Sequence, residues 1–217
     1  PRSSEAIPTP TIARSEPNSS QPSSDPGFVV AEQPAFETPS LPVGAAQLPL
    51  RLSDDGRSLV DQHGVPFLVV GDAAWSMVVQ LDSEETETYL SNRRAQGFNT
   101  LLVNLIEHMF ADAPPGNADG EVPFVDGDFA RPNTAYFDAA HDSIAQAADE
   151  GFVVMLTPAY LGYNGGDEGW YEEMLAAGPE KLRSYGRFVG ERFGDLDNVV
   201  WVHGGDFTPP PEHLDLV

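Results

Sequence analysis

The feature that most constrains the fold is a regular alternation of short apolar runs with longer stretches that have helical spacing. Four runs are apolar enough to form buried strands, at residues 67–70, 100–106, 152–156 and 199–202. Polar or glycine residues follow each run, and an amphipathic stretch separates each run from the next. Alternation of this kind predicts a parallel sheet with right-handed helical crossovers.

Three helices are predicted between these strands from their capping residues and apolar spacing. They begin at Asp82 or Ser83, after Asn133 and at Pro179, and they end at Gly97, Gly151 and Gly194. No glycine-rich phosphate-binding motif follows any strand, so nucleotide-binding folds lack their usual sign. A (β/α)8 barrel needs eight βα steps over roughly 250 residues. The predicted fold is therefore α/β, a (β/α)8 TIM barrel truncated after about the fourth strand.

The N-terminal part of the chain has a different composition. Residues 1–46 are dominated by Pro, Ser, Thr and Glu, with too little apolar surface to offset the entropy of ordering. We expect a disordered linker there, and a partial barrel domain over residues 47–217 that opens with a β-hairpin around the turn 54–56. Linkers of this kind are common in exported bacterial proteins, so we expect an extracellular or cell-surface location, although this chain contains no signal peptide.

The charge and composition exclude several partners. The chain has 34 acidic and 11 basic residues, a formal net charge of -23, and no cysteine. Such a surface repels nucleic-acid phosphates, and no stretch approaches the roughly 20 apolar residues that insert into a membrane. The five histidines are too scattered for a zinc site. We expect no nucleic acid, no membrane insertion and no metal or other cofactor, and the oligomeric state stays open.

Polar and aromatic residues gather where the predicted strands end. In a (β/α)8 barrel the loops at this end carry the functional residues. Aromatic rings stack on sugar C–H groups, while carboxylates and amides hydrogen-bond sugar hydroxyls. The pattern therefore favours a carbohydrate substrate. The candidate substrate-binding residues are Asp72, Trp75, Asn104, Glu107, His108, Tyr160 and His203.

Structural roles compete with binding at several of these positions. Asp72 can cap the turn that follows it, and Trp75 can form a wall of the core. Glu107 and His108 open a long loop, where a solvated position is an alternative. His203 can be a hydrogen-bonded core histidine. The sequence leaves both interpretations open at each position.

Asp206 is the candidate catalytic residue. It follows an apolar strand and two glycines, Gly204 and Gly205, which allow the backbone to turn tightly and bring a carboxylate into a cleft. Glycoside hydrolysis needs two carboxylates, one of which carries a proton at the working pH. An aspartate that caps the following segment 207–209 would produce the same spacing. Spacing alone therefore supports both roles equally.

A set of short motifs, taken together in order, resembles the apiosidase-like glycoside hydrolases of family 140. The motifs are Gly64-Val65-Pro66-Phe67, Gly71-Asp72-Ala73-Ala74-Trp75, Gln96-Gly97-Phe98-Asn99, Asn133-Thr134-Ala135-Tyr136-Phe137, Asn198-Val199-Val200-Trp201 and Gly204-Gly205-Asp206. The resemblance covers about residues 48 to 210 and implies a (β/α)8 catalytic domain. It implies that the enzyme hydrolyses a glycosidic bond in a plant-type polysaccharide, such as apiose-containing pectin.

The same resemblance implies the roles of the two carboxylates. Asp206 corresponds to the catalytic acid/base. The nucleophile is a glutamate near the end of a later strand, outside this chain, so the chain alone is expected to be inactive. Two other functions stay open, a non-catalytic carbohydrate-binding module on an incomplete barrel and a barrel lyase or isomerase. The sequence does not specify the sugar or whether the reaction retains or inverts configuration.

Overall fold

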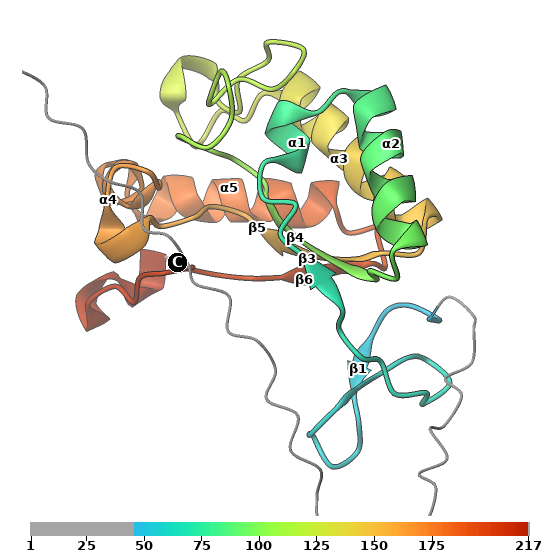
Figure 1. The fold of residues 1–217 in the computed structure, drawn as a ribbon. Coiled ribbons are helices and arrows are strands. Elements are labelled where there is room, and N and C mark those ends of the chain that lie inside the picture. Colours follow the sequence, from blue (N-terminus) through green and yellow to red (C-terminus); the bar gives the residue numbers. More distant parts are fainter. Residues whose placement is uncertain (1–45, 217) are drawn as a thin grey trace, which may run out of the picture. The chain divides into compact units, whose positions relative to one another are not determined.

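The computed structural model describes residues 46–216 and contains two separate sheets (Figure 1). The smaller sheet pairs β1 (Arg51–Leu52) with β2 (Leu59–Val60) in antiparallel fashion. Its turn is closed by the Gly56 amide, which donates to the Ser53 carbonyl at 2.8 Å. The predicted hairpin is confirmed. The linker predicted over residues 1–46 lies almost entirely outside the described residues and stays a prediction.

The larger sheet has four parallel strands in the order β3-β4-β5-β6. They are β3 (Gly71–Asp72), β4 (Thr100–Asn104), β5 (Val153–Thr157) and β6 (Val199–Trp201). Each strand pairs with the next strand along the chain, without the reversal of order that marks a doubly wound sheet. This order confirms the prediction of a (β/α)8-type barrel, of which the four strands form a part.

Strand β3 begins later than the sequence predicts, because a side chain takes the place of the neighbouring strand. The amide of Val70 donates to Oδ1 of Asn99 at 2.8 Å, and Nδ2 of Asn99 donates to the carbonyl of Leu68 at 2.8 Å. The first backbone bonds toward β4 are made by the Val70 carbonyl, which accepts from the amides of Asn99 at 3.0 Å and Thr100 at 3.3 Å. Regular pairing starts at Gly71, opposite Thr100.

Five α-helices occur within residues 46–216, and all of them follow β3 in the chain. They are α1 (Met77–Gln80), α2 (Ser83–Ala95), α3 (Thr134–Asp149), α4 (Tyr171–Ala177) and α5 (Pro179–Arg192). The three predicted helices are α2, α3 and α5. Helices α1 and α4 are too short to produce a periodic apolar pattern in the sequence. None of the helices in the described part of the chain is long and apolar enough to cross a membrane.

The core lies between the parallel sheet and the helices, which Figure 1 shows on one side of the sheet. The central strands place Leu101, Val103, Val154 and Leu156 on this helix face, and all four side chains are fully buried. Burial of apolar surface on this scale is the main stabilising contribution to such a domain. We call the opposite face of the sheet the open face, because Val200 there is 39% exposed. In a complete barrel this face forms the packed interior.

Asp82, one of the two N-cap residues that the sequence predicts for α2, caps the helix and forms a capping box with Glu85. Oδ1 of Asp82 accepts from the amides of Glu84 and Glu85, each at 2.9 Å, and the Glu85 carboxylate accepts from the Asp82 amide at 3.1 Å. We predict that Asp82→Ala lowers the free energy of unfolding by about 1 kcal/mol, because two helix amides lose their acceptor. Urea denaturation measures this change. The exposed Glu87 lies on the same helix outside the box, and Glu87→Ala should change stability much less.

Candidate active site

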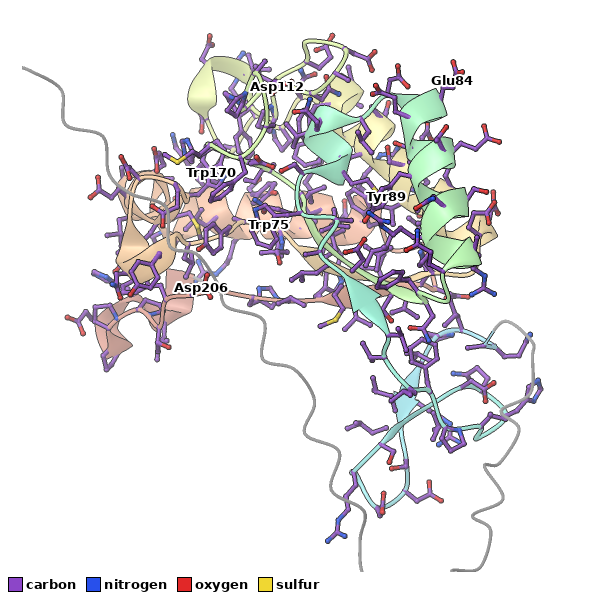
Figure 2. The ribbon with its side chains drawn as sticks, viewed as in Figure 1. Trp75, Glu84, Tyr89, Asp112, Trp170 and Asp206 are labelled. Carbon is purple, nitrogen blue, oxygen red and sulfur yellow. The ribbon has the colours of Figure 1, made fainter. Side chains whose placement is uncertain are left out.

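A cleft of about 330 Å³ opens on the open face, at the carboxyl ends of β4, β5 and β6. Figure 2 labels Trp75 and Asp206 at this end of the sheet. Asp206 is the only carboxylate on the cleft wall within residues 46–216. The lining residues are Trp75, Leu102, Phe110, Thr157, Tyr160, Val202, Gly205 and Asp206. The structure thus brings together three of the predicted site residues, Trp75, Tyr160 and Asp206.

The Asp206 carboxylate is exposed to solvent and is held by one tyrosine. The Tyr160 hydroxyl donates to Oδ2 of Asp206 at 3.0 Å. Burial of the phenol, followed by its bond to Asp206, raises the pKa of Tyr160 to about 12. The hydroxyl therefore keeps its proton and remains a donor wherever Asp206 is ionised.

Two glycines place Asp206 against this tyrosine. Gly204 and Gly205 have φ angles of 88° and 105°, in the region that favours glycine. The Gly204 carbonyl accepts from the Leu161 amide at 3.1 Å, which continues the pairing of β5 and β6 beyond the strand ends. A Cβ atom at Gly205 would lie 2.5 Å from Cδ2 of Tyr160. The tight turn predicted for the two glycines is confirmed, and close contact with the ring adds a second reason for glycine at 205.

Aromatic side chains form the walls of the cleft. The half-buried Trp75 ring meets the Tyr160 ring edge-on, with centroids 5.1 Å apart and planes at 88°. Phe110, from the long loop after β4, is 53% exposed on the same cleft. Exposed aromatic surface beside a carboxylate is suited to binding the apolar face of a sugar ring.

Asn104 is the last residue of β4 and is not among the residues that line the cleft. It pairs in register with Thr157, which lines the cleft, so its side chain is on the open face. The backbone amide of Asn104 donates to the Trp75 carbonyl at 2.9 Å, which connects the end of β4 to the residue that forms one aromatic wall. The side chain is 1% exposed, and its Oδ1 has no hydrogen-bond partner in the described part of the chain. An unsatisfied buried acceptor of this kind is unusual in a native protein.

Asp72 points away from the cleft. It pairs with Leu101, which is buried on the helix face, so Asp72 also lies on that face. Its Oδ2 accepts from the Tyr89 hydroxyl at 2.9 Å and forms an ion pair with Arg93, and both partners belong to α2. Figure 2 labels Tyr89 on this helix, away from Trp75 and Asp206. The hydrogen bond and the ion pair connect β3 to α2.

His203 and His108 also lie outside the cleft lining. His203 lines a separate apolar groove of about 270 Å³ between β6 and α5, together with Trp201. The His108 ring stacks on Trp170 with centroids 3.9 Å apart, and its Nε2 lies 3.4 Å from the Glu173 carboxylate. Both histidines therefore contact other parts of the chain.

Glu107 is fully buried, so its interpretation as a solvated loop residue is wrong. Burial raises the pKa of its carboxyl group above the usual range for glutamate. Three donors oppose this rise: the Ser76 hydroxyl and the amides of Phe110 and Ala111. None of them reaches the carboxylate in full hydrogen-bonding geometry. Glu107 is not among the residues that line the cleft.

Five lining residues were absent from the sequence prediction of substrate-binding and catalytic residues. They are Leu102, Phe110, Thr157, Val202 and Gly205. Alternation along the strands would have identified Leu102, which lies two residues before Asn104, and Thr157 is the last residue of β5. Phe110 lies in a loop without periodicity and gives no sequence signal. Among residues 46–216, no group of three or more metal-ligating side chains lies close enough to hold a metal ion.

Comparison with known proteins assigns most of the described chain to a family. The family described as apiosidase-like, catalytic domain, matches residues 53–215. A glycoside hydrolase family 5 structure from Bacteroides vulgatus ATCC 8482 has a TM-score of 0.62 and 25% sequence identity, covering 77% of this chain and 34% of that one. A second structure, described as a glycoside hydrolase, has a TM-score of 0.62 and 23% identity, covering 77% and 36%. The chain spans about a third of both structures. A search of the curated proteins found no match.

The contact between Gly205 and Tyr160 generates a prediction. Gly205→Ala should displace the Tyr160 ring and break its edge-on pairing with Trp75, because the new methyl group would overlap the ring. Near-ultraviolet circular dichroism should lose intensity. Gly204→Ala is the matched control: it carries a similar backbone strain of roughly 1–2 kcal/mol, but the nearest atom to its Cβ is the Phe207 carbonyl oxygen at 3.6 Å. Equal spectra for the two variants would contradict the prediction.

Proposed function

The chain belongs to the apiosidase-like family, and on that premise we propose that it carries the catalytic acid/base, Asp206, of a glycoside hydrolase. The observation that carries the proposal is the hydrogen bond from Tyr160 to Asp206 in a cleft at the carboxyl ends of the strands. Catalytic residues of (β/α)8 enzymes lie at this end. The aromatic walls beside Asp206 support a sugar as the substrate.

The proposed chemistry uses Asp206 first as an acid. Its carboxyl proton passes to the glycosidic oxygen while the bond from that oxygen to the anomeric carbon breaks, and the bonding electron pair leaves with the oxygen. Asp206 is then a carboxylate, and the Tyr160 hydroxyl donates to it at 3.0 Å. Because Tyr160 keeps its own proton, this donor stabilises the charge as it forms. A water molecule then adds its oxygen to the anomeric carbon and gives its proton to Asp206, which restores the acid.

A second carboxylate is needed on the other side of the bond, roughly 5–5.5 Å away in retaining enzymes or 6.5–9.5 Å away in inverting ones. Asp206 is the only carboxylate lining the cleft in the part that the structure describes. We propose that a glutamate from a later strand of a complete barrel supplies it. The similar structures are about three times as long as the matched region, which supports this source.

We propose a plant-type polysaccharide, such as apiose-containing pectin, as the substrate. Trp75 and Phe110 offer aromatic faces to a sugar ring. A polymer of this size does not enter a cell intact, which supports an extracellular or cell-surface location. Asp72 and His203, which contact α2 and the groove beside α5, have structural roles in this proposal.

The test compares variants in the protein with a complete barrel, using an apiose-containing pectic oligosaccharide. Asp206→Asn should reduce the release of reducing sugar about 10²- to 10⁴-fold, because the amide cannot donate the proton, while calorimetric affinity stays within about threefold. Asp197→Asn is the control, since Asp197 is an exposed aspartate in the loop before β6. Turnover above a few per cent of wild type in Asp206→Asn would remove Asp206 from the role.

A carbohydrate-binding module is the second candidate, favoured by the single carboxylate in the described cleft. The present chain should bind the oligosaccharide without hydrolysing it under either candidate. The complete-barrel protein separates them, because a hydrolase turns over and a binding module only binds. Hydrolysis by the present chain alone would show that its second carboxylate lies within these 217 residues.

A further inference from the structure

The segment that follows Asp206 is held at a second point, distinct from the contact between Asp206 and Tyr160. Phe207 comes directly after Asp206, and the 3-10 helix η3 (Pro211–Leu216) follows a few residues later. Figure 1 shows this end of the chain beside α4. Both parts of the segment contact Tyr171, the first residue of α4.

Tyr171 contacts this segment through its ring and through its hydroxyl group. Its ring meets the Phe207 ring at a steep angle, with centroids 4.8 Å apart and planes at 71°. Its hydroxyl group forms a hydrogen bond with Nδ1 of His213, 2.6 Å away. Edge-to-face aromatic pairs and hydrogen bonds each favour a defined geometry. The two contacts together therefore restrict the path of the chain between residues 207 and 213.

Gly165, in the loop after β5, packs on the same two rings. Its φ angle is 73°, and a Cβ atom there would lie 2.9 Å from Cδ1 of Tyr171 and 3.1 Å from Cε1 of Phe207. A side chain at this position would therefore push the rings apart. Because glycine has none, the loop after β5 can lie directly against the pair formed by Tyr171 and Phe207.

The start of α4 is also connected to the tyrosine that holds Asp206. The amide of Trp170, the N-cap residue of α4, donates to the Tyr160 carbonyl at 2.8 Å. The Tyr160 hydroxyl in turn donates to Asp206. Figure 2 labels Trp170 at the same end of the sheet as Asp206. Two adjacent residues, Trp170 and Tyr171, thus connect the tyrosine that holds the carboxylate with the segment that carries it.

We propose that Tyr171 is a positioning residue for Asp206. It fixes Phe207 and His213 against the start of α4 and thereby sets the place of the Asp206 carboxylate beside the Tyr160 hydroxyl. Its effect on the reaction rests on the proposed function of the cleft. Tyr171 is not among the residues that line the cleft, so it acts through Asp206 and not on the sugar. A displacement of about 1 Å in a catalytic group can lower the rate about 10²-fold.

Hydrogen–deuterium exchange on the complete-barrel protein tests the positioning without any substrate. The Leu161 amide reports whether the segment is in place, because it donates to the Gly204 carbonyl at 3.1 Å. Tyr171→Leu should speed exchange of the peptide that contains Leu161 about tenfold. Tyr171→Phe keeps the ring contact with Phe207 and should speed exchange to a smaller extent.

Two variants of His213 test the hydrogen bond from the other side. His213→Asn should exchange as the wild type does, because its amide can still bond to the Tyr171 hydroxyl, whereas His213→Leu should match Tyr171→Phe. Tyr89→Phe is the control, since it also loses a tyrosine hydrogen bond, to Asp72, but away from the cleft.

Kinetics of the same protein on the pectic oligosaccharide supply a readout that a purely structural role would not change. Tyr171→Leu should lower kcat about 10²-fold and leave KM within about threefold, because a displaced acid weakens only the interaction made in the transition state. Tyr171→Phe should lower kcat about tenfold, and Tyr89→Phe should leave both constants unchanged.

Three results would overturn the proposal. They are wild-type exchange of Leu161 in Tyr171→Leu, equal exchange in the two His213 variants, and a raised KM with unchanged kcat in Tyr171→Leu. The expected exchange pattern in a protein that hydrolyses no glycoside supports the positioning role and contradicts only the proposed function.

Discussion

The rest of the structure depends on one constraint, the burial of a single face of a parallel sheet against its helices. Four side chains of the central strands face the helices and are fully buried: Leu101, Val103, Val154 and Leu156. Since side chains alternate along a strand, this burial directs Leu102 and Asn104 to the open face. The parallel direction of the strands then brings all four carboxyl ends to one edge, where the cleft lies.

At that edge, backbone geometry and side-chain contact specify the site together. Gly204 extends the pairing of β5 and β6, and Gly205 lets the backbone approach the Tyr160 ring closely. Asp206 is thereby exposed to solvent yet held in one place by a phenol that does not titrate near neutral pH. A carboxylate that must reach a substrate benefits from this combination, since its position is set before the substrate arrives.

Two buried polar side chains lie at the end of β4 and just after it. Oδ1 of Asn104 and both carboxylate oxygens of Glu107 have no hydrogen-bond partner among the described residues. Polar groups in such positions lower stability unless they are satisfied. The family match over residues 53–215 includes both positions.

The amino-acid sequence by itself determined what depends on local patterns. Apolar runs located β4, β5 and β6, capping residues located α2, α3 and α5, and two glycines marked the turn before Asp206. The tertiary structure decided what each side chain faces. Asp72 turns to α2 because its register partner is on the helix face, and Glu107, three residues after β4, is fully buried. Register and loop path arise from contacts between distant segments, so no local pattern records them.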